Sequence, residues 1–158
     1  MIQFTPIGFV HNEISQAHRD TNWDTIESEI IIDCKWIDAL DGVAEFSHIW
    51  VVFHIHSIPP PDALRIRPMK RDEHSVPLVG IFATRSPQRP NPIGIAAVEL
   101  LAVSDNVLRV RGLDAIDGTP VLDVKPYLAL GDAITDTRVP DWVKQYWRSR
   151  NLQDPKGF

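Results

Sequence analysis

The sequence predicts an all-β domain, and three observations support that fold class. Short runs rich in β-branched and apolar residues recur along the chain, as in residues 29–32 and 47–56. Helical signals are few. The chain also lacks the glycine-rich pattern that opens a nucleotide-binding βαβ unit, so a Rossmann domain is not expected. Many strands with little helix are typical of a β-barrel or a β-sandwich.

Seven segments are expected to be strands: residues 4–10, 29–32, 47–56, 78–84, 93–103, 107–112 and 121–124. Ser104-Asp105-Asn106 has the composition of a hairpin turn between two of them. A helix or turn is expected over residues 33–40, where Asp33 is a candidate N-cap. Pro140 opens an expected C-terminal helix that runs to about Arg150.

Composition and charge limit the class of protein to which the chain can belong. The 158 residues, 44% hydrophobic and 23% charged, predict one globular domain over 1–158, with its core in 4–132 and a C-terminal helix and tail in 140–158. No apolar run is long enough to span a membrane, and the N-terminus has no signal-peptide pattern, so a cytoplasmic protein without membrane contact is expected. Cys34 is the single cysteine, which excludes an internal disulfide and a cysteine zinc cluster.

Basic charge is concentrated in one stretch of an acidic chain. Residues 65–89 contain six basic and two acidic residues, although the whole chain carries a net charge of −5. The total argues against a protein that coats nucleic acid non-specifically. A local basic face instead suits a defined anionic partner, and a solvated loop with scattered charges is the alternative.

The densest motif is residues 80–94, Gly-Ile-Phe-Ala-Thr-Arg-Ser-Pro-Gln-Arg-Pro-Asn-Pro-Ile-Gly. Proline fixes its own φ and favours an extended residue before it, so Ser86, Arg89 and Asn91 are expected in a stiff, extended loop. Rigid loops that present arginines hold anionic ligands in fixed geometry. A simple connection with solvated arginines would have the same composition.

A second polar motif covers residues 113–127, Leu-Asp-Ala-Ile-Asp-Gly-Thr-Pro-Val-Leu-Asp-Val-Lys-Pro-Tyr. Asp117-Gly118 is a strong turn signal. Asp123, Lys125 and Tyr127 fall on one face of a strand, where Asp123 and Lys125 are expected to pair. The motif is either one wall of a polar pocket or a hairpin with a solvated face.

Three histidines could suggest a metal site, but we do not predict one. His48, His54 and His56 share one strand face because their spacing is even. No acidic residue of this run shares that face. The histidines are therefore expected to be structural or to contact substrate.

The two motifs, together with Glu45-Phe46-Ser47-His48-Ile49-Trp50 and the opening Ile7-Gly8-Phe9-Val10-His11, resemble the TrmO (YaeB, TsaA-like) family. The motifs occur in the order of the family, and the resemblance spans about residues 4–132. It implies a small closed or nearly closed β-barrel with peripheral helices, which uses S-adenosylmethionine without a Rossmann domain. It also implies homodimers that methylate N6 of threonylcarbamoyladenosine, next to the anticodon in threonine-decoding tRNA.

The resemblance also assigns residues. The predicted cofactor-binding residues are His54, Ile55, Arg85, Ile95, Asp114, Ala115, Ile116 and Asp117. The residues themselves, and not the resemblance, give the other candidates: the predicted catalytic residues are Asp117, Asp123, Lys125 and Tyr127, and the predicted substrate-binding residues are Arg67, Lys70, Arg89 and Asn91. Because the acceptor nitrogen carries a proton and is a poor nucleophile, a base such as Asp117, Asp123 or His54, or a water molecule, is expected to assist.

The chain departs from the family pattern in three places. Residues 17–24 replace a Pro-Arg-Gln segment that helps to hold the cofactor, and Arg19 is the candidate substitute. Ile95-Ala96-Ala97 lacks the usual hydroxyl, and the end at Phe158 predicts that the extra C-terminal domain of longer bacterial members is missing. Two alternatives therefore stay open: a methyltransferase of this fold acting on a small molecule, and a module that binds S-adenosylmethionine without turnover.

Overall fold

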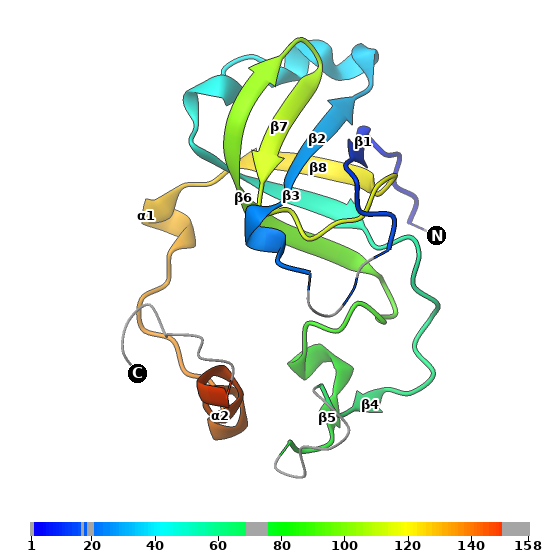
Figure 1. Ribbon diagram of the computed structural model, residues 1–158, viewed down its shortest axis with the longest axis vertical. Coiled ribbons are helices and arrows are strands. Elements are labelled where there is room, and N and C mark those ends of the chain that lie inside the picture. Colours follow the sequence, from blue (N-terminus) through cyan, green and yellow to red (C-terminus); the bar gives the residue numbers. More distant parts are fainter. Residues whose placement is uncertain (1, 17, 19–20, 69–75, 150–158) are drawn as a thin grey trace. The chain divides into compact units, whose positions relative to one another are not determined.

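The computed structural model describes residues 2–16, 18, 21–68 and 76–149, which fall into two compact units. The first unit comprises the described residues of 1–60 and 87–129, and the second comprises those of 61–86 and 130–158. The first unit forms a closed six-stranded β-barrel (Figure 1). The predicted all-β barrel class is thus confirmed, while a single domain over 1–158 stays a prediction.

The barrel strands are all antiparallel and follow the order β1-β2-β7-β6-β3-β8, with β8 pairing back onto β1. Their bounds are β1 Gly8–His11, β2 Glu27–Ile32, β3 His48–His54, β6 Ile93–Ser104, β7 Val107–Arg111 and β8 Pro120–Pro126. Three 3₁₀ helices belong to the same unit: η1 (Trp23–Thr25), η2 (Cys34–Leu40) and η3 (Val43–Glu45). A one-turn helix, α1 (Ala129–Asp132), follows β8.

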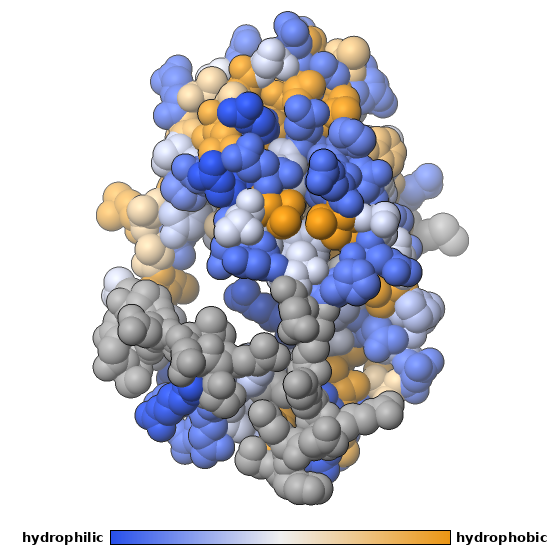
Figure 2. Space-filling model, viewed as in Figure 1, coloured by the Kyte–Doolittle hydropathy of each residue, from blue (hydrophilic) through white to orange (hydrophobic). Residues whose placement is uncertain are grey.

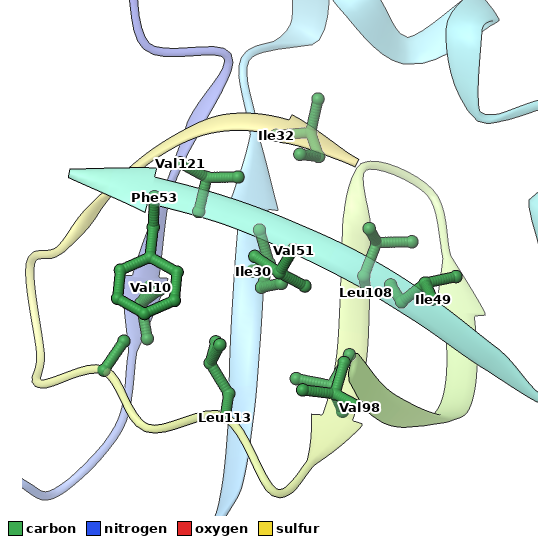
Figure 3. Packing of buried hydrophobic residues seen from close by; sticks show 12 residues of the cluster. Val10, Ile30, Ile32, Ile49, Val51, Phe53, Val98, Leu108, Leu113 and Val121 are labelled. Carbon is green, nitrogen blue, oxygen red and sulfur yellow. The ribbon is translucent and has the colours of Figure 1, made fainter. Parts of the chain in front are cut away.

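Alternate residues of each strand fill the barrel interior, as the two-residue period of a strand requires. In β3, Ile49, Val51 and Phe53 are buried, while the residues between them face outward. Figure 3 shows these side chains meeting those of the other strands inside the barrel. The buried cluster is Val10, Ile30, Ile32, Ile49, Val51, Phe53, Val98, Leu108, Val110, Leu113, Ala115 and Val121.

The first predicted strand is shorter than expected. The sequence predicted residues 4–10, but β1 begins at Gly8, and Phe4 is 64% exposed. Gly8 lies opposite Ile32, the last residue of β2. Residues before Ile7 therefore have no β2 residue to pair with, whatever their β propensity.

The predicted turn between residues 103 and 107 and both predicted helices are present. Asp105 adopts a positive φ of 51° between β6 and β7, a conformation that Asp tolerates better than most residues. Asp33 caps η2 by accepting a hydrogen bond from the Lys35 N–H at 3.2 Å. The C-terminal helix α2 spans Asp141–Ser149, and the Pro140 carbonyl accepts hydrogen bonds from its first turn.

The second unit contains α2 and a two-stranded sheet of β4 (Arg65–Ile66) and β5 (Val79–Gly80). The predicted strand over 78–84 is wrong beyond Gly80, because the chain continues as the 3₁₀ helix η4 (Ile81–Ala83). The Thr84 side chain and backbone N–H both donate to the Ile81 carbonyl and so close this turn. Phe82 consequently remains 78% exposed.

Among the described residues, no helix is long and apolar enough to cross a membrane.

Candidate functional site

The register of the barrel gathers several predicted site residues at one end. We call it the loop end: β1, β3 and β7 end there, and β2, β6 and β8 begin there. Phe53, near the end of β3, pairs with Gly94 of β6 and with Val121 of β8. His54 and Ile55, which follow Phe53, therefore share this end with the 114–117 loop, which precedes β8.

The 112–119 segment crosses the loop end with the side chains of Leu113 and Ala115 turned inward. Leu113 and Ala115 are buried, and Figure 3 shows Leu113 pointing from the loop toward Ile30 in the core. Asp114 and Asp117, the polar residues on either side of Ala115, are exposed. The loop thus presents two carboxylates at the surface while Leu113 and Ala115 anchor it in the core.

Asp117 occupies the predicted tight turn, and its carboxylate is held from two sides. Gly118 supplies the positive φ of 73° that the turn needs. The Asp117 carboxylate accepts hydrogen bonds from the Asn12 backbone N–H at 3.1 Å and from His11 Nδ1 at 2.9 Å. The Asn12 N–H, helped by His11, lowers the pKa of Asp117 below its ordinary value. Asp117 is therefore a fixed anion, and its side chain is still 43% exposed.

Asn12 is a residue of the loop end that the sequence did not indicate. Its Nδ2 donates to Ser28 Oγ and to the Ala115 carbonyl, both at 2.9 Å. Its Oδ1 accepts from the Ile14 N–H at 2.9 Å. These partners lie up to 103 positions away in the chain, so no local motif could have identified Asn12.

The remaining cofactor candidates of the first unit lie at the start of β6 and the end of β3. The Ile55 N–H donates to the Pro92 carbonyl at 2.8 Å, which ties the end of β3 to the proline-rich loop. Ile95 lies opposite Val52 on the outer face and is 61% exposed. His54 lies opposite Ile93 and is also exposed.

The three other catalytic candidates follow one another along β8, away from the loop end. Lys125 Nζ lies 2.6 Å from Asp123 Oδ2, which confirms the predicted pairing. Tyr127 follows β8 and donates its backbone N–H to the carbonyl of His48, the first residue of β3. Its ring centroid lies 5.6 Å from that of Trp50. The structure thus places Asp117 and Tyr127 toward opposite ends of the barrel.

The proline-rich loop divides between the two units. Residues 85–92 form neither helix nor strand, as predicted for a stiff connection. Arg89 and Asn91 belong to the first unit, with Arg89 half-buried and Asn91 exposed. Arg85 belongs to the second unit and is exposed, and its contact with the cofactor stays a prediction.

The predicted substrate residues of the second unit lie around its small sheet. The Arg67 guanidinium donates to the Val76 carbonyl at 2.5 Å, and Arg65 donates in the same way to the Leu78 carbonyl at 3.2 Å. Arg67 remains exposed. Lys70 and the candidate substitute Arg19 lie outside the described residues.

A mostly apolar pocket of about 170 Å³ opens elsewhere on the barrel, beside η2. It is lined by Ile7, Ile32, Trp36, Ala39, Leu40, Val43, Asp123 and Val124. Except for Asp123, none of these is a predicted site residue. The hollow is therefore distinct from the loop end. In the part of the chain that the structure describes, no group of three or more His, Cys, Asp or Glu side chains is arranged to hold a metal ion.

Similarity to known proteins points to one family. The sequence pattern of the tRNA-methyltransferase O N-terminal domain matches residues 10–133. A probable S-adenosyl-L-methionine-binding protein of Methanothermobacter thermautotrophicus is 42% identical over 129 residues, which cover 80% of this chain and 90% of that protein. The tRNA (adenine(37)-N6)-methyltransferase of Escherichia coli is 39% identical over 70% of this chain, which spans only 48% of that enzyme. The crystal structure of TrmO from Pseudomonas aeruginosa matches with a TM-score of 0.65 at 28% identity, covering 87% of this chain and 61% of that one.

Proposed function

The chain belongs to the tRNA-methyltransferase O family, and on that premise we propose that it methylates N6 of an adenosine in tRNA. S-adenosyl-L-methionine is the cofactor, in keeping with the name of the archaeal relative, and it supplies the methyl group. The name of the Escherichia coli relative supports adenosine 37 of tRNA as the acceptor. The finer substrate, threonylcarbamoyladenosine next to the anticodon, is part of the proposal.

One observation carries this function: the predicted cofactor residues of the first unit gather at the loop end. The site there combines a fixed anion, Asp117, with exposed or half-buried apolar side chains at Ile95, Ile55 and Ile116. That set fits a ligand with an ammonium group and an apolar, aromatic ring. We assign the ammonium group to Asp117 or Asp114, the ring to the isoleucines and the backbone of Ala115, and the carboxylate to Arg85.

Methyl transfer requires alignment of the acceptor nitrogen with the methyl group more than covalent help from the protein. A general base is effective when its pKa lies near the working pH. Because the hydrogen bond from Asn12 lowers the pKa of Asp117, that carboxylate suits ligand binding better than proton abstraction. We therefore assign proton removal from N6 to Asp123 or His54, or to a water molecule that they orient.

Basic and polar residues of the second unit and of the proline-rich loop would hold the tRNA. Arg67 and Lys70 supply positive charge, and in the proline-rich loop Arg89 adds a guanidinium and Asn91 an amide. Arginine and lysine contacts to phosphates give affinity without base specificity. These four residues are proposed to position the substrate.

A homodimer is also proposed, and the outer face of the barrel supports it. Ile95 and Ile93 of β6 are 61% and 43% exposed and lie beside Val52 and His54 of β3. Exposed apolar patches of this kind mark interaction surfaces. Figure 2 shows hydrophobic side chains interrupting the hydrophilic surface on the face of the molecule turned to the viewer. Sedimentation should give a dimer for the wild type and a monomer for Ile95→Glu, and a monomeric wild type would contradict this assignment.

Mass spectrometry of nucleosides tests the proposed reaction. The purified protein is incubated with methyl-labelled S-adenosyl-L-methionine and threonine tRNA that carries threonylcarbamoyladenosine. A labelled N6-methyl-threonylcarbamoyladenosine peak is expected, and tRNA lacking the modification is the matched control. Equal labelling of both tRNAs would support tRNA methyltransferase activity but exclude threonylcarbamoyladenosine as the specific substrate.

A module that binds the cofactor without turnover is the second candidate function. The name of the archaeal relative, which this chain covers at 90% of its length, refers to binding and not to catalysis. Clear binding of S-adenosyl-L-methionine by calorimetry, with no label on any tRNA or small acceptor, would favour this alternative. Label on a small molecule alone would favour the small-molecule methyltransferase. For each of these functions, we propose that the protein is cytoplasmic. We also propose that residues 1–158 form one domain.

A further inference from the structure

We propose that Asn12 is the positioning residue of the cofactor loop, residues 114–117. This inference rests on the proposed function, because it concerns the residues there assigned to S-adenosyl-L-methionine. Asn12 lies directly after β1, and only Gly118 and Thr119 separate the loop from β8. β1 and β8 pair at Gly8 and Phe9, so the barrel itself brings the two segments together.

Asn12 contacts the loop through both its main chain and its side chain. Its backbone N–H donates to the Asp117 carboxylate at 3.1 Å, and its Nδ2 donates to the Ala115 carbonyl at 2.9 Å. One residue thus fixes two positions of the loop, on either side of Ile116. Ile116 is thereby held in a defined orientation at the loop end.

Asn12 is itself held in place from the barrel side. Its Nδ2 also donates to Ser28 Oγ, and Ser28 is only 2% exposed on the inner face of β2. Its Oδ1 accepts from the Ile14 N–H, and the Ile14 carbonyl in turn accepts from the Asp117 N–H at 2.8 Å. The amide is therefore the centre of a network in which each hydrogen bond fixes the next.

The chemistry of the amide group makes Asn12 hard to replace. An amide carries two N–H donors and a carbonyl acceptor, and here the donors meet two acceptors while the acceptor meets a donor. A carboxylate would face the Ala115 carbonyl without a proton to donate. An aliphatic side chain would leave the buried Ser28 hydroxyl without this partner.

Asn106 provides a matched control at the opposite end of the barrel. It lies in the turn between β6 and β7, and its Nδ2 donates to the Ile32 carbonyl, the same kind of contact that Asn12 makes with Ala115. Asn106→Ala should therefore destabilise the barrel as Asn12→Ala does. Since Asn106 is remote from the cofactor loop, its loss should leave cofactor affinity unchanged.

The test compares Asn12→Ala, Asn106→Ala and the milder Ser28→Ala in the full chain. Calorimetry should show about tenfold weaker binding of S-adenosyl-L-methionine for Asn12→Ala, which loses the three side-chain hydrogen bonds of Asn12 but keeps the backbone N–H bond to Asp117. For Ser28→Ala, which leaves the Asn12–Ala115 bond in place, the loss should be about threefold. Asn106→Ala should stay within about twofold of the wild type at a similar loss of thermal stability.

A second measurement does not depend on the cofactor. Hydrogen exchange of the Asp117 and Gly118 amides, which donate to the Ile14 and Val10 carbonyls, should accelerate in Asn12→Ala and not in Asn106→Ala.

If the wild type and Asn12→Ala bind the cofactor equally well, the positioning role is wrong while the proposed function stands. If the wild type does not bind the cofactor at all, both are overturned. Equal losses of affinity in the Asn12 and Asn106 variants would reduce Asn12 to a general stabilising residue and overturn the proposal.

Discussion

Replacing Gly94 with alanine should destabilise the barrel because no space exists for a methyl group there. Gly94 pairs with Phe53 across β6 and β3. A Cβ on Gly94 would overlap three atoms of the Phe53 ring, Cδ2, Cε2 and Cζ. Phe53 is only 4% exposed, so its ring is confined by the other side chains of the core.

The magnitude follows from two opposing effects. Forcing an extra carbon into a packed core costs about 1–3 kcal/mol. Replacing glycine by alanine also restricts the unfolded chain, which returns about 0.4–1 kcal/mol where the backbone conformation is compatible. A net loss of about 1–2 kcal/mol is expected, equivalent to a urea midpoint lower by about 1 M or slightly less.

A double-mutant cycle identifies the cause of that loss. Phe53→Val removes all three ring atoms that the new methyl group would meet, and valine suits a strand. In the Phe53→Val background, Gly94→Ala should cost less than about 0.5 kcal/mol, so the coupling free energy should exceed about 0.5 kcal/mol. Unfolding followed by tryptophan fluorescence measures all four proteins. An equal cost in both backgrounds would refute the steric explanation and assign Gly94 another role.

Four further outcomes are expected. Because the pKa of Asp117 is lowered in the folded protein, its carboxylate stabilises the fold at pH values above the ordinary aspartate pKa, and this stabilisation is lost as the pH falls through the lowered value. The wild type should therefore melt at a higher temperature than Asp117→Asn at pH 7, and the difference should vanish toward pH 2. Arg85→Ala should weaken S-adenosyl-L-methionine binding by about 10–100-fold in calorimetry, and unchanged affinity would remove Arg85 from the site. Arg67→Glu should weaken tRNA binding and lower the slope of log K against log salt by about 1, whereas an unchanged slope would place the RNA elsewhere. Asp123→Asn should lower kcat by about 100-fold and Tyr127→Phe by much less, and the reverse order in single-turnover kinetics would make Tyr127 the catalytic group.

The strands that pack the barrel could be predicted from the sequence because burial on one face leaves a local pattern. The alternation in β7, where the buried Leu108 and Val110 flank the exposed Arg109, can be read from the residue types themselves. Residues 78–84 have a similar apolar composition, yet the strand there ends at Gly80 and η4 follows it. Whether an apolar run becomes a strand depends on a neighbour with which to pair, and that neighbour is not encoded locally.

The candidate site, like the fold, could be predicted from the sequence only where its residues leave a local pattern. Asp117-Gly118 indicates its turn because Asp and Gly are residue types that turn conformations favour. Asn12 has no such signal, because its partners Ser28 and Ala115 become neighbours only when the barrel closes. The strand order was equally hidden, since β7 inserts between β2 and β6.

The geometry of β8 orders the catalytic candidates by their distance from the loop end. A strand rises about 3.3 Å per residue, so Tyr127 lies about 13 Å farther along than Asp123. The rings of Trp50 and His48 pack against Tyr127 with centroids 5.6 and 6.3 Å away, which gives Tyr127 a structural role where β3 begins. If the methyl group is bound at the loop end, as we propose, an adenosine N6 aligned with it would lie closer to Asp123 than to Tyr127. We therefore propose separate roles for these four residues: Asp117 would hold the ligand, Asp123 with Lys125 would lie nearest to the reacting nitrogen, and Tyr127 would stabilise the far end of the sheet.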